Sequence, residues 1–257
     1  MTDYLAAINP HKRDAEIEFD EKPHIYTVRG STDNTSVTKF CHSQFKPFNA
    51  DEAIQRMMAS PNWPKNKYFG KTEKEIALEW KKQGCEAAVK GTKMHKMIED
   101  YYQLGHFKEP IECSESEVRL FKEFLKKNSH LKPYRAEWMI WDEQLRLAGS
   151  IDMVFKNHDG DLVIYDWKRC KNIKKTAFGN AFSRTPCISH IPDSNYWHYA
   201  LQLNVYKAIL ERNYDVKIKG MALVQLHPEQ ALYKIFHLPD LQSEVNDLFA
   251  LRLSKLH

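Results

Sequence analysis

The sequence contains neither the long apolar runs nor the closely spaced cysteines that mark several classes of protein. No stretch of its 257 residues approaches the roughly 18 consecutive apolar residues that a membrane-spanning helix requires. Residues 1–22 mix acidic and basic side chains and have no apolar centre of the kind found in secretory signals. We therefore expect an intracellular protein without a signal peptide or a transmembrane segment.

Cysteines are few and scattered along the chain. Five occur, an odd number, and no two have the spacing of a metal-binding knuckle, which disfavours an iron–sulfur or zinc site built from them. Reduced thiols are therefore the expected state. The net charge of +4 is mildly basic and gives weak support for a polyanionic partner.

The chain is divided into an N-terminal part with mainly helical signals and a C-terminal part in which strands and helices alternate. A possible break at Gly84 interrupts the second helical stretch, and a capping box of Ser114 and Glu117 begins the third. Helices are predicted at 49–59, 72–104, 114–127, 196–211 and 240–254, and strands at 24–28, 134–142, 145–155, 161–168, 220–228 and 232–238.

This order of elements predicts an α/β fold in which helices flank a central mixed β-sheet. Residues 86–257 are expected to form the core. Residues 1–85, with a short strand and several helices, are expected to be an N-terminal elaboration that packs on it, so that the chain forms one compact unit. Neither an internal repeat nor a low-complexity tract is present.

The most informative acids lie on two consecutive strands. Asp166 and Lys168 point to the same face because side chains alternate along a strand. A three-residue turn at 158–160, with Gly160 left-handed, sets Asp152 of the preceding strand directly across from Asp166. Two such carboxylates favour a hard cation between them, Mg²⁺ or Mn²⁺. A structural ion pair of Asp166 and Lys168 explains this hairpin alone equally well.

Two helices place polar groups on the faces that should meet the core. At about 100° per residue, His95 and Glu99 fall at the centre of the inward side of the first helix, and a neutral imidazole is a good metal ligand. In the helix at 196–211, Gln202 and Tyr206 face inward, whereas Asn204 falls on the solvated side. Each pattern alone is typical of a structural polar network, but beside the hairpin they favour an active site.

The order of these residues resembles the PD-(D/E)XK nuclease superfamily, and within it the RecB-like exonuclease branch, which includes the mitochondrial genome-maintenance exonuclease. The resemblance covers about residues 88–236. It rests on His95, Glu137, Gly149-Ser150-Ile151-Asp152, Asp166-Trp167-Lys168 and Gln202-Leu203-Asn204-Val205-Tyr206.

The resemblance implies a restriction-endonuclease-like core with a bound Mg²⁺ or Mn²⁺. Its metal ligands would be the side chains of His95, Asp152 and Asp166 and the backbone carbonyl of Trp167. Several members of this branch hold an iron–sulfur cluster with three cysteines near the C-terminus. No cysteine follows Cys187, so an iron–sulfur cluster is not expected here.

The same resemblance assigns catalytic roles on the strands and on the helix at 196–211. Lys168 would be the catalytic lysine, acting beside Asp152 and Asp166. Glu137 matches an acid that is often found upstream of them, and Gln202 and Tyr206 match a helix motif that lies near the DNA and the lysine. The predicted catalytic set is Asp152, Asp166, Lys168, Glu137, Gln202 and Tyr206.

Residues 169–194 are too long for a plain connection and are rich in basic side chains, as a track for a phosphate backbone would be. Tyr196, Trp197 and Tyr199 follow this segment and could stack on the bases of a single strand. A solvated basic loop and core aromatics are the alternative. The predicted substrate-binding set is Lys171, Lys174, Lys175, Arg184, Tyr199, Gln202 and Tyr206.

The function predicted from these features is metal-dependent hydrolysis of DNA phosphodiester bonds by an exonuclease that prefers single strands. DNA that is single-stranded or has free ends is the expected partner, no membrane is involved, and protein partners stay open. An RNA endonuclease is an alternative, since viral cap-snatching enzymes use a similar histidine with acids, and so is a structure-specific DNA endonuclease. A non-catalytic DNA-binding module is disfavoured because every acid and the lysine are present.

Overall fold

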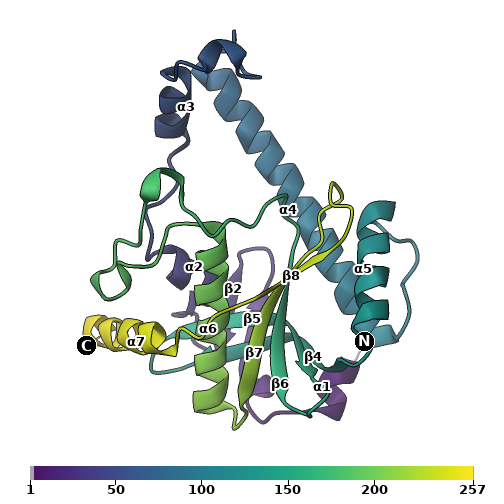
Figure 1. Cartoon of the computed structure of the whole chain (residues 1–257). Helices are drawn as coiled ribbons and strands as arrows, with labels where there is room; N and C mark the ends of the chain where they lie inside the picture. The colour runs from purple at the N-terminus through teal and green to yellow at the C-terminus, as the bar shows by residue number, and fades with distance from the viewer. Residues whose placement is uncertain (1–2, 257) are drawn as a thin grey trace.

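A mixed sheet of six strands forms the centre of the protein, here described by a computed structural model for residues 3–256 (Figure 1). Its long strands follow the order β4, β5, β6, β7, β8, and the short β3 pairs with the beginning of β5. β6 and β7 are parallel, as are β3 and β5, and the other neighbours are antiparallel. The strands are β3 (Thr35–Ser36), β4 (Lys132–Asp142), β5 (Leu147–Lys156), β6 (Leu162–Lys168), β7 (Ile218–Gln225) and β8 (Lys234–His237).

Helices cover both faces of this sheet, which confirms the predicted fold class. α6 lies on one face, and α4 and α5 lie on the other (Figure 1). A separate antiparallel hairpin of β1 (Ile17–Asp20) and β2 (Ile25–Val28) belongs to the N-terminal part. The helices are α1 (Tyr4–Ile8), α2 (Val37–His42), α3 (Ala50–Met58), α4 (Glu73–Leu104), α5 (Glu115–Lys127), α6 (Asn195–Asn213) and α7 (Gln242–Leu256).

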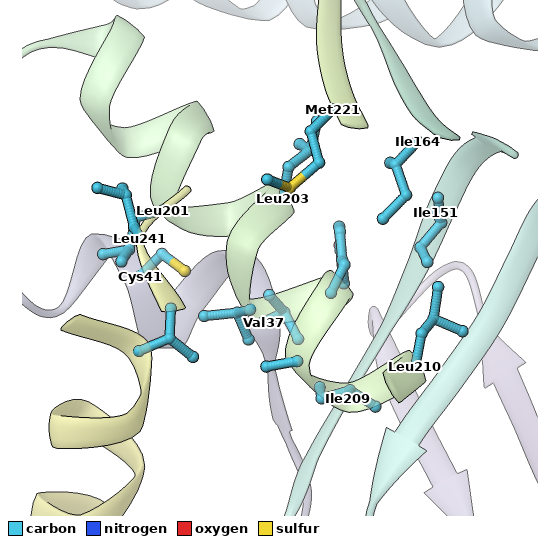
Figure 2. Close-up of a cluster of buried hydrophobic side chains, with 14 of the residues drawn as sticks. Val37, Cys41, Ile151, Ile164, Leu201, Leu203, Ile209, Leu210, Met221 and Leu241 are labelled. Atoms are coloured by element: carbon cyan, nitrogen blue, oxygen red, sulfur yellow. The ribbon is translucent and has the colours of Figure 1, made fainter. Parts of the chain in front are cut away.

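Two apolar clusters hold these layers together. Figure 2 shows the first, in which Leu203 of α6 meets Ile151, Ile164 and Met221 of β5, β6 and β7. The second lies between the opposite face and the helices α4 and α5, around the buried Trp167. Burial of apolar surface on both sides explains why the strands are apolar on both faces. A charged residue on such a strand is therefore costly unless it is paired.

α6 is buried on nearly all sides, so the predicted solvated stripe of this helix is wrong. Asn204 has no exposed surface. Its side chain donates to the carbonyl oxygens of Ala200 and Pro239, and it accepts from the amide of Leu241. α7 and the segment leading to it cover this side of α6, which a helical pattern alone does not indicate.

α4 is a continuous helix of 32 residues, without the break predicted at Gly84. It therefore runs through position 85, where the sequence suggested a boundary, and the division of the chain into two parts stays a prediction. The first half of α4 and α3 extend away from the sheet (Figure 1). A small apolar cluster around Ile54, Tyr68 and Ile76 joins them there.

Within residues 3–256, no helix combines the length and the apolar character that crossing a bilayer would require.

Candidate active site

The turn between β5 and β6 has the predicted geometry. The Asn157 amide donates to the carbonyl oxygen of Asp161 over 2.9 Å, which leaves three residues in the turn, and Gly160 is left-handed with φ of 83°. The resulting register pairs Met153 with Tyr165. Asp152 and Asp166 occupy the next position along the two strands, and the charge of Asp152 raises the pKa of Asp166. The predicted turn and its register are therefore confirmed.

β5 and β6 separate beyond the Met153–Tyr165 pair, and Asp152 lies in the fork between them. The amide of Trp167 donates to Asp152 Oδ2 over 2.9 Å, in place of a bond to the backbone of β5. The carboxylate therefore holds the fork open at a fixed width. A fork of this kind gives side chains from several strands access to one point.

Glu137 of β4 extends the row of acids to a third strand. The register pairs Ala136 with Met153 and Trp138 with Ile151, which sets Glu137 beside Asp152. Glu137 has a φ of 43°, an uncommon conformation for a residue other than glycine. Its carboxylate accepts a hydrogen bond from Ser150 Oγ over 2.8 Å. Backbone strain at an acid in such a cluster is typical of functional sites.

Lys168 and Asp166 form a close ion pair at the end of β6. Lys168 Nζ lies 2.6 Å from Asp166 Oδ2 and 4.5 Å from the centre of the Tyr199 ring. Burial alone would lower the pKa of Lys168, but the charges of Asp166 and Asp152 outweigh it and raise the pKa, so the ammonium stays charged. The contact is not aligned as a hydrogen bond, and Asp166 Oδ2 accepts none from the described residues.

His95 reaches the fork from α4, although its place on the helix differs from the prediction. The buried side of α4 is formed by Met94, Met97, Ile98 and Tyr102, so His95 and Glu99 lie at its edge rather than at its centre. Ala88 and Gly91, which lie about two turns and one turn before His95 on the same side of the helix, are not buried either. The edge position lets the imidazole meet the ends of the strands instead of the apolar core.

The contacts of His95 leave room for a cation. Nε2 lies 2.8 Å from the carbonyl oxygen of Trp167 and, as the donor, carries the proton. In the neutral imidazole, Nδ1 is then an acceptor, and it lies 3.5 Å from Asp152 Oδ2, which is also an acceptor. Two acceptors that face each other at this distance are stabilised by a positive charge between them.

The donor atoms around the fork suit a divalent metal. One atom each of His95, Glu137 and Asp152 lie within 4.8 Å of one another. Carboxylate and carbonyl oxygens bind hard divalent cations, and imidazole binds divalent transition-metal ions. Asp166 Oδ2, which is paired with Lys168, lies beside the same group. The residues present therefore fit a divalent ion. Glu137 belongs to the tight cluster with His95, while Asp166 faces Lys168.

Charge crowding should make the stability of the metal-free protein depend on pH. Burial and the neighbouring Asp152 raise the pKa of Glu137 to about 8 and that of Asp166 to about 6. These two carboxyls bind more protons in the folded protein than in the unfolded chain between about pH 4 and pH 8, so their contribution to stability falls as the pH rises through this window. Burial lowers the pKa of four histidines, which contribute in the opposite sense below about pH 7: His11, His42, His198 and His227. The effect of the acids is therefore measured against a variant that lacks one of them.

As the pH rises from 6 to 8 in EDTA, we expect the melting temperature of the wild type to fall relative to that of Glu137→Gln, measured by scanning calorimetry. Both proteins carry the same histidines, so the difference between them reports the Glu137 carboxyl. Saturating Mn²⁺ should remove most of this relative fall, because it replaces the protons. A metal-free wild type whose melting temperature changes in parallel with that of Glu137→Gln would contradict the charge crowding.

Gln202 and Tyr206 of α6 dock against the beginning of β5. Gln202 Nε2 donates to the hydroxyl of Tyr206 over 3.2 Å and to Thr38 Oγ1 over 3.0 Å. Tyr206 is buried, and its ring covers Gly149, where a Cβ would lie 2.8 Å from Tyr206 Cε1. Glycine at this position lets α6 approach the strand that carries Asp152.

Gly149→Ala should therefore destabilise the fold, because the buried Tyr206 ring has no space to withdraw. We expect a loss of about 1–3 kcal/mol in the free energy of unfolding, measured by urea denaturation. Gly84→Ala is the matched control. A Cβ there meets nothing within 4 Å, so a gain of about 0.5–1 kcal/mol is expected. Equal effects of the two substitutions would refute the close approach of Tyr206.

The N-terminal part contributes residues to the site that the sequence did not indicate. Tyr26 of β2 is buried, and burial and the charge of Glu137 raise its pKa to about 12. Thr38 of α2 bonds to Gln202. His42 of α2 lies near enough to Lys168 that burial and this ammonium lower its pKa. No sequence signal identifies these residues, because they reach the site only through the packing of β2 and α2.

The basic residues predicted to bind substrate are dispersed. Lys171 pairs with Glu229, while Lys174 and Lys175 are exposed on the segment at 169–194. Their role in binding stays a prediction. Arg184 donates to the carbonyl oxygen of Ser43 over 3.1 Å, which joins the same segment to the chain after α2.

The aromatic residues after this segment differ in their access to solvent. Tyr196 is only 3% exposed, so it is not available to stack on a base. Trp197 donates to the carbonyl oxygen of Lys175 over 3.0 Å, and Tyr199 covers the ammonium of Lys168. Tyr199 is thus part of the active-site wall.

A row of acids at the fork of a mixed sheet, with a lysine on the last of the three strands, is the arrangement of a metal-dependent nuclease. The family model of the PD-(D/E)XK nuclease superfamily matches residues 112–253, more than half of the chain, and the protein belongs to this superfamily. The matched segment contains the six predicted catalytic residues. His95 and the N-terminal residues of the site lie outside it.

Solved structures with a similar chain path are distant. The crystal structure of SSO0001 shares 15% identity, with 88% of this chain and 78% of that chain covered and a TM-score of 0.34. A "Putative exonuclease" from Eubacterium rectale shares 14% identity, with 66% and 64% covered and a TM-score of 0.36. The match thus spans less than two thirds of the latter chain. A search of curated proteins gave no match.

Proposed function

We propose that the protein is a metal-dependent DNA exonuclease of the RecB-like branch that prefers single-stranded DNA. The observation that carries the proposal is the row of Glu137, Asp152 and Asp166 across three neighbouring strands, with Lys168 bound to the last of them. Such a row concentrates negative charge where a divalent ion and a phosphate can meet.

His95, Asp152, Asp166 and the carbonyl of Trp167 would hold Mg²⁺ or Mn²⁺, with Glu137 as a further acid in the same cluster. When bound, the metal lowers the pKa of a water and neutralises charge on the phosphate. Lys168 remains a cation in a buried place and orients the water or a phosphate oxygen. The aromatic ring of Tyr199 and the pair with Asp166 fix the direction of its ammonium.

A large cavity along α2 and α3 supports the preference for single strands. It has a volume of about 1250 Å³ and lies between α2, α3 and the segment at 178–184. Two of its aromatic residues are strongly exposed, Phe48 at 77% and Phe178 at 80%. Cations and stacking surfaces together are typical of sites for single-stranded nucleic acid. The basic residues of its wall are Lys39, Lys46, Arg56 and Arg184.

A contact across this cavity supports the exonuclease mode. The guanidinium of Arg56 on α3 lies 5.8 Å from the centre of the Phe178 ring, so α3 and the segment at 178–180 meet. Arg184 joins the same segment to Ser43. We infer that a strand led between these two elements reaches the site by its end.

The proposal is tested with end-labelled single-stranded DNA, double-stranded DNA and RNA, and with circular single-stranded DNA, each in the presence of Mn²⁺. We expect the linear single strand of DNA to be degraded fastest and the circle to resist. Cleavage of the circle at a similar rate would show an endonuclease. Preferential cleavage of RNA would show that the substrate class is wrong.

A further inference from the structure

Two residues of α2 lie where two cavities meet. The cavity of about 1250 Å³ runs along α3, and a second of about 580 Å³ lies between β2 and α2. Of the described residues, only Lys39 and His42 line both. Both side chains are exposed, whereas Val37, Phe40 and Cys41 of the same helix are buried. α2 therefore presents a cationic edge to the passage between the cavities.

This passage adjoins the active site. Thr38, next to Lys39 on α2, bonds to Gln202, which also bonds to Tyr206 at the base of the acid row. Tyr199, whose ring covers the ammonium of Lys168, directly follows His198 on α6, and the His198 ring contacts that of His42. Tyr26, which is near Glu137, lines the smaller cavity. A strand that places one phosphate beside Lys168 therefore brings its next phosphate toward Lys39 and His42.

A second histidine supports His42 from behind. The rings of His42 and His198 lie 5.3 Å apart in an edge-to-face arrangement. His198 Nε2 bonds to Asp193 Oδ1 over 2.8 Å, and its ring packs 4.0 Å from that of Phe45. These contacts hold the His198 ring in place, and the His42 ring packs against it. A held imidazole and a lysine side by side suit one phosphate group.

We propose that Lys39 and His42 form a subsite for the phosphodiester next to the one that is cut. The subsite rests on the proposed nucleic-acid substrate. Its two residues would hold the strand in place at the linkage next to the one that is cut. Lys39 supplies charge, and the imidazole donates a directed hydrogen bond to a phosphate oxygen. His198 is a positioning residue.

The test pairs substitutions in the protein with single neutral linkages in the DNA. A series of single-stranded oligonucleotides carries one methylphosphonate at successive positions, and affinity is measured by fluorescence anisotropy with Ca²⁺ in place of Mn²⁺. For the wild type, a methylphosphonate at one linkage next to the cut should lower the affinity about 10-fold. The Lys39→Ala and His42→Ala variants should bind the unmodified strand more weakly. A methylphosphonate at that linkage should no longer lower their affinity.

Lys207→Ala is the matched control, because Lys207 lines neither cavity and pairs with Asp240 over 2.7 Å. It should leave the linkage as sensitive as in the wild type. His42→Gln, which keeps an N–H donor, should retain part of the coupling. Additive effects of Lys39→Ala and His42→Ala at every linkage would overturn the subsite. If the wild type binds in this way but cleaves no DNA with Mn²⁺, the proposed function fails and the subsite does not.

Discussion

Lys168→Ala is expected to reduce the rate of DNA cleavage about 10³-fold while metal binding persists. The ammonium lies 2.6 Å from Asp166 Oδ2 and is held under Tyr199, so it is the fixed cation closest to the acid row. The substitution removes a buried positive charge, and such a charge interacts more strongly with a phosphate in a buried site than it would in water. Initial rates on an end-labelled single strand with saturating Mn²⁺, beside calorimetric titration with Mn²⁺, measure the two quantities separately.

Lys207→Ala provides the matched control for this substitution. Lys207 is on α6, and its ammonium lies 2.7 Å from Asp240 Oδ2, so the same kind of ion pair is lost outside the site. Its activity should stay within about twofold of the wild type, since the pair contributes little more than a surface salt bridge. Retention of activity in Lys168→Ala, or an equal loss in Lys207→Ala, would refute a specific role for Lys168.

Asp152→Asn should abolish metal-dependent cleavage and weaken Mn²⁺ binding, with an effect on rate of at least about 10³-fold. The substitution keeps an oxygen that accepts the hydrogen bond of the Trp167 amide, so the fork between β5 and β6 should remain. It removes the negative charge that faces His95 and Glu137. We therefore expect metal binding and cleavage to be lost because a charge is removed, while the protein stays folded.

Asp159→Asn is the comparison for this acid, because Asp159 lies in the turn of the same hairpin and is exposed. Far-ultraviolet circular dichroism should be unchanged for both variants. Mn²⁺ affinity and cleavage should be lost only for Asp152→Asn. If Asp152→Asn binds Mn²⁺ and cuts DNA as the wild type does, the acid row is not the metal site.

Local rules predict the centre of the site well. The alternation along a strand placed Asp166 and Lys168 together, and the glycine of the turn set the register that brings Asp152 to them. Both depend on residues that are close in sequence. The sheet and the helices on its two faces follow from the same short-range patterns, and so does the capping box at Ser114 that begins α5.

Long-range packing decides the features that the sequence did not predict. A helical pattern shows which residues share a side, but not what covers that side. Asn204 was therefore predicted to be exposed, although α7 and the segment before it bury it, and His95 lies at the edge of a buried side and not at its centre. Tyr26 and His42 reach the site from the N-terminal part, and nothing in the local sequence marks them.

A divalent metal that binds in the fork between β5 and β6 and serves phosphodiester cleavage is central to the proposed function. Anomalous diffraction at the manganese edge from crystals grown with Mn²⁺ tests it directly. We expect a peak in contact with Asp152 and bounded by His95, Asp166 and the carbonyl of Trp167, which disappears in Asp152→Asn. A peak elsewhere, in crystals of a protein that cleaves DNA with Mn²⁺, would contradict it.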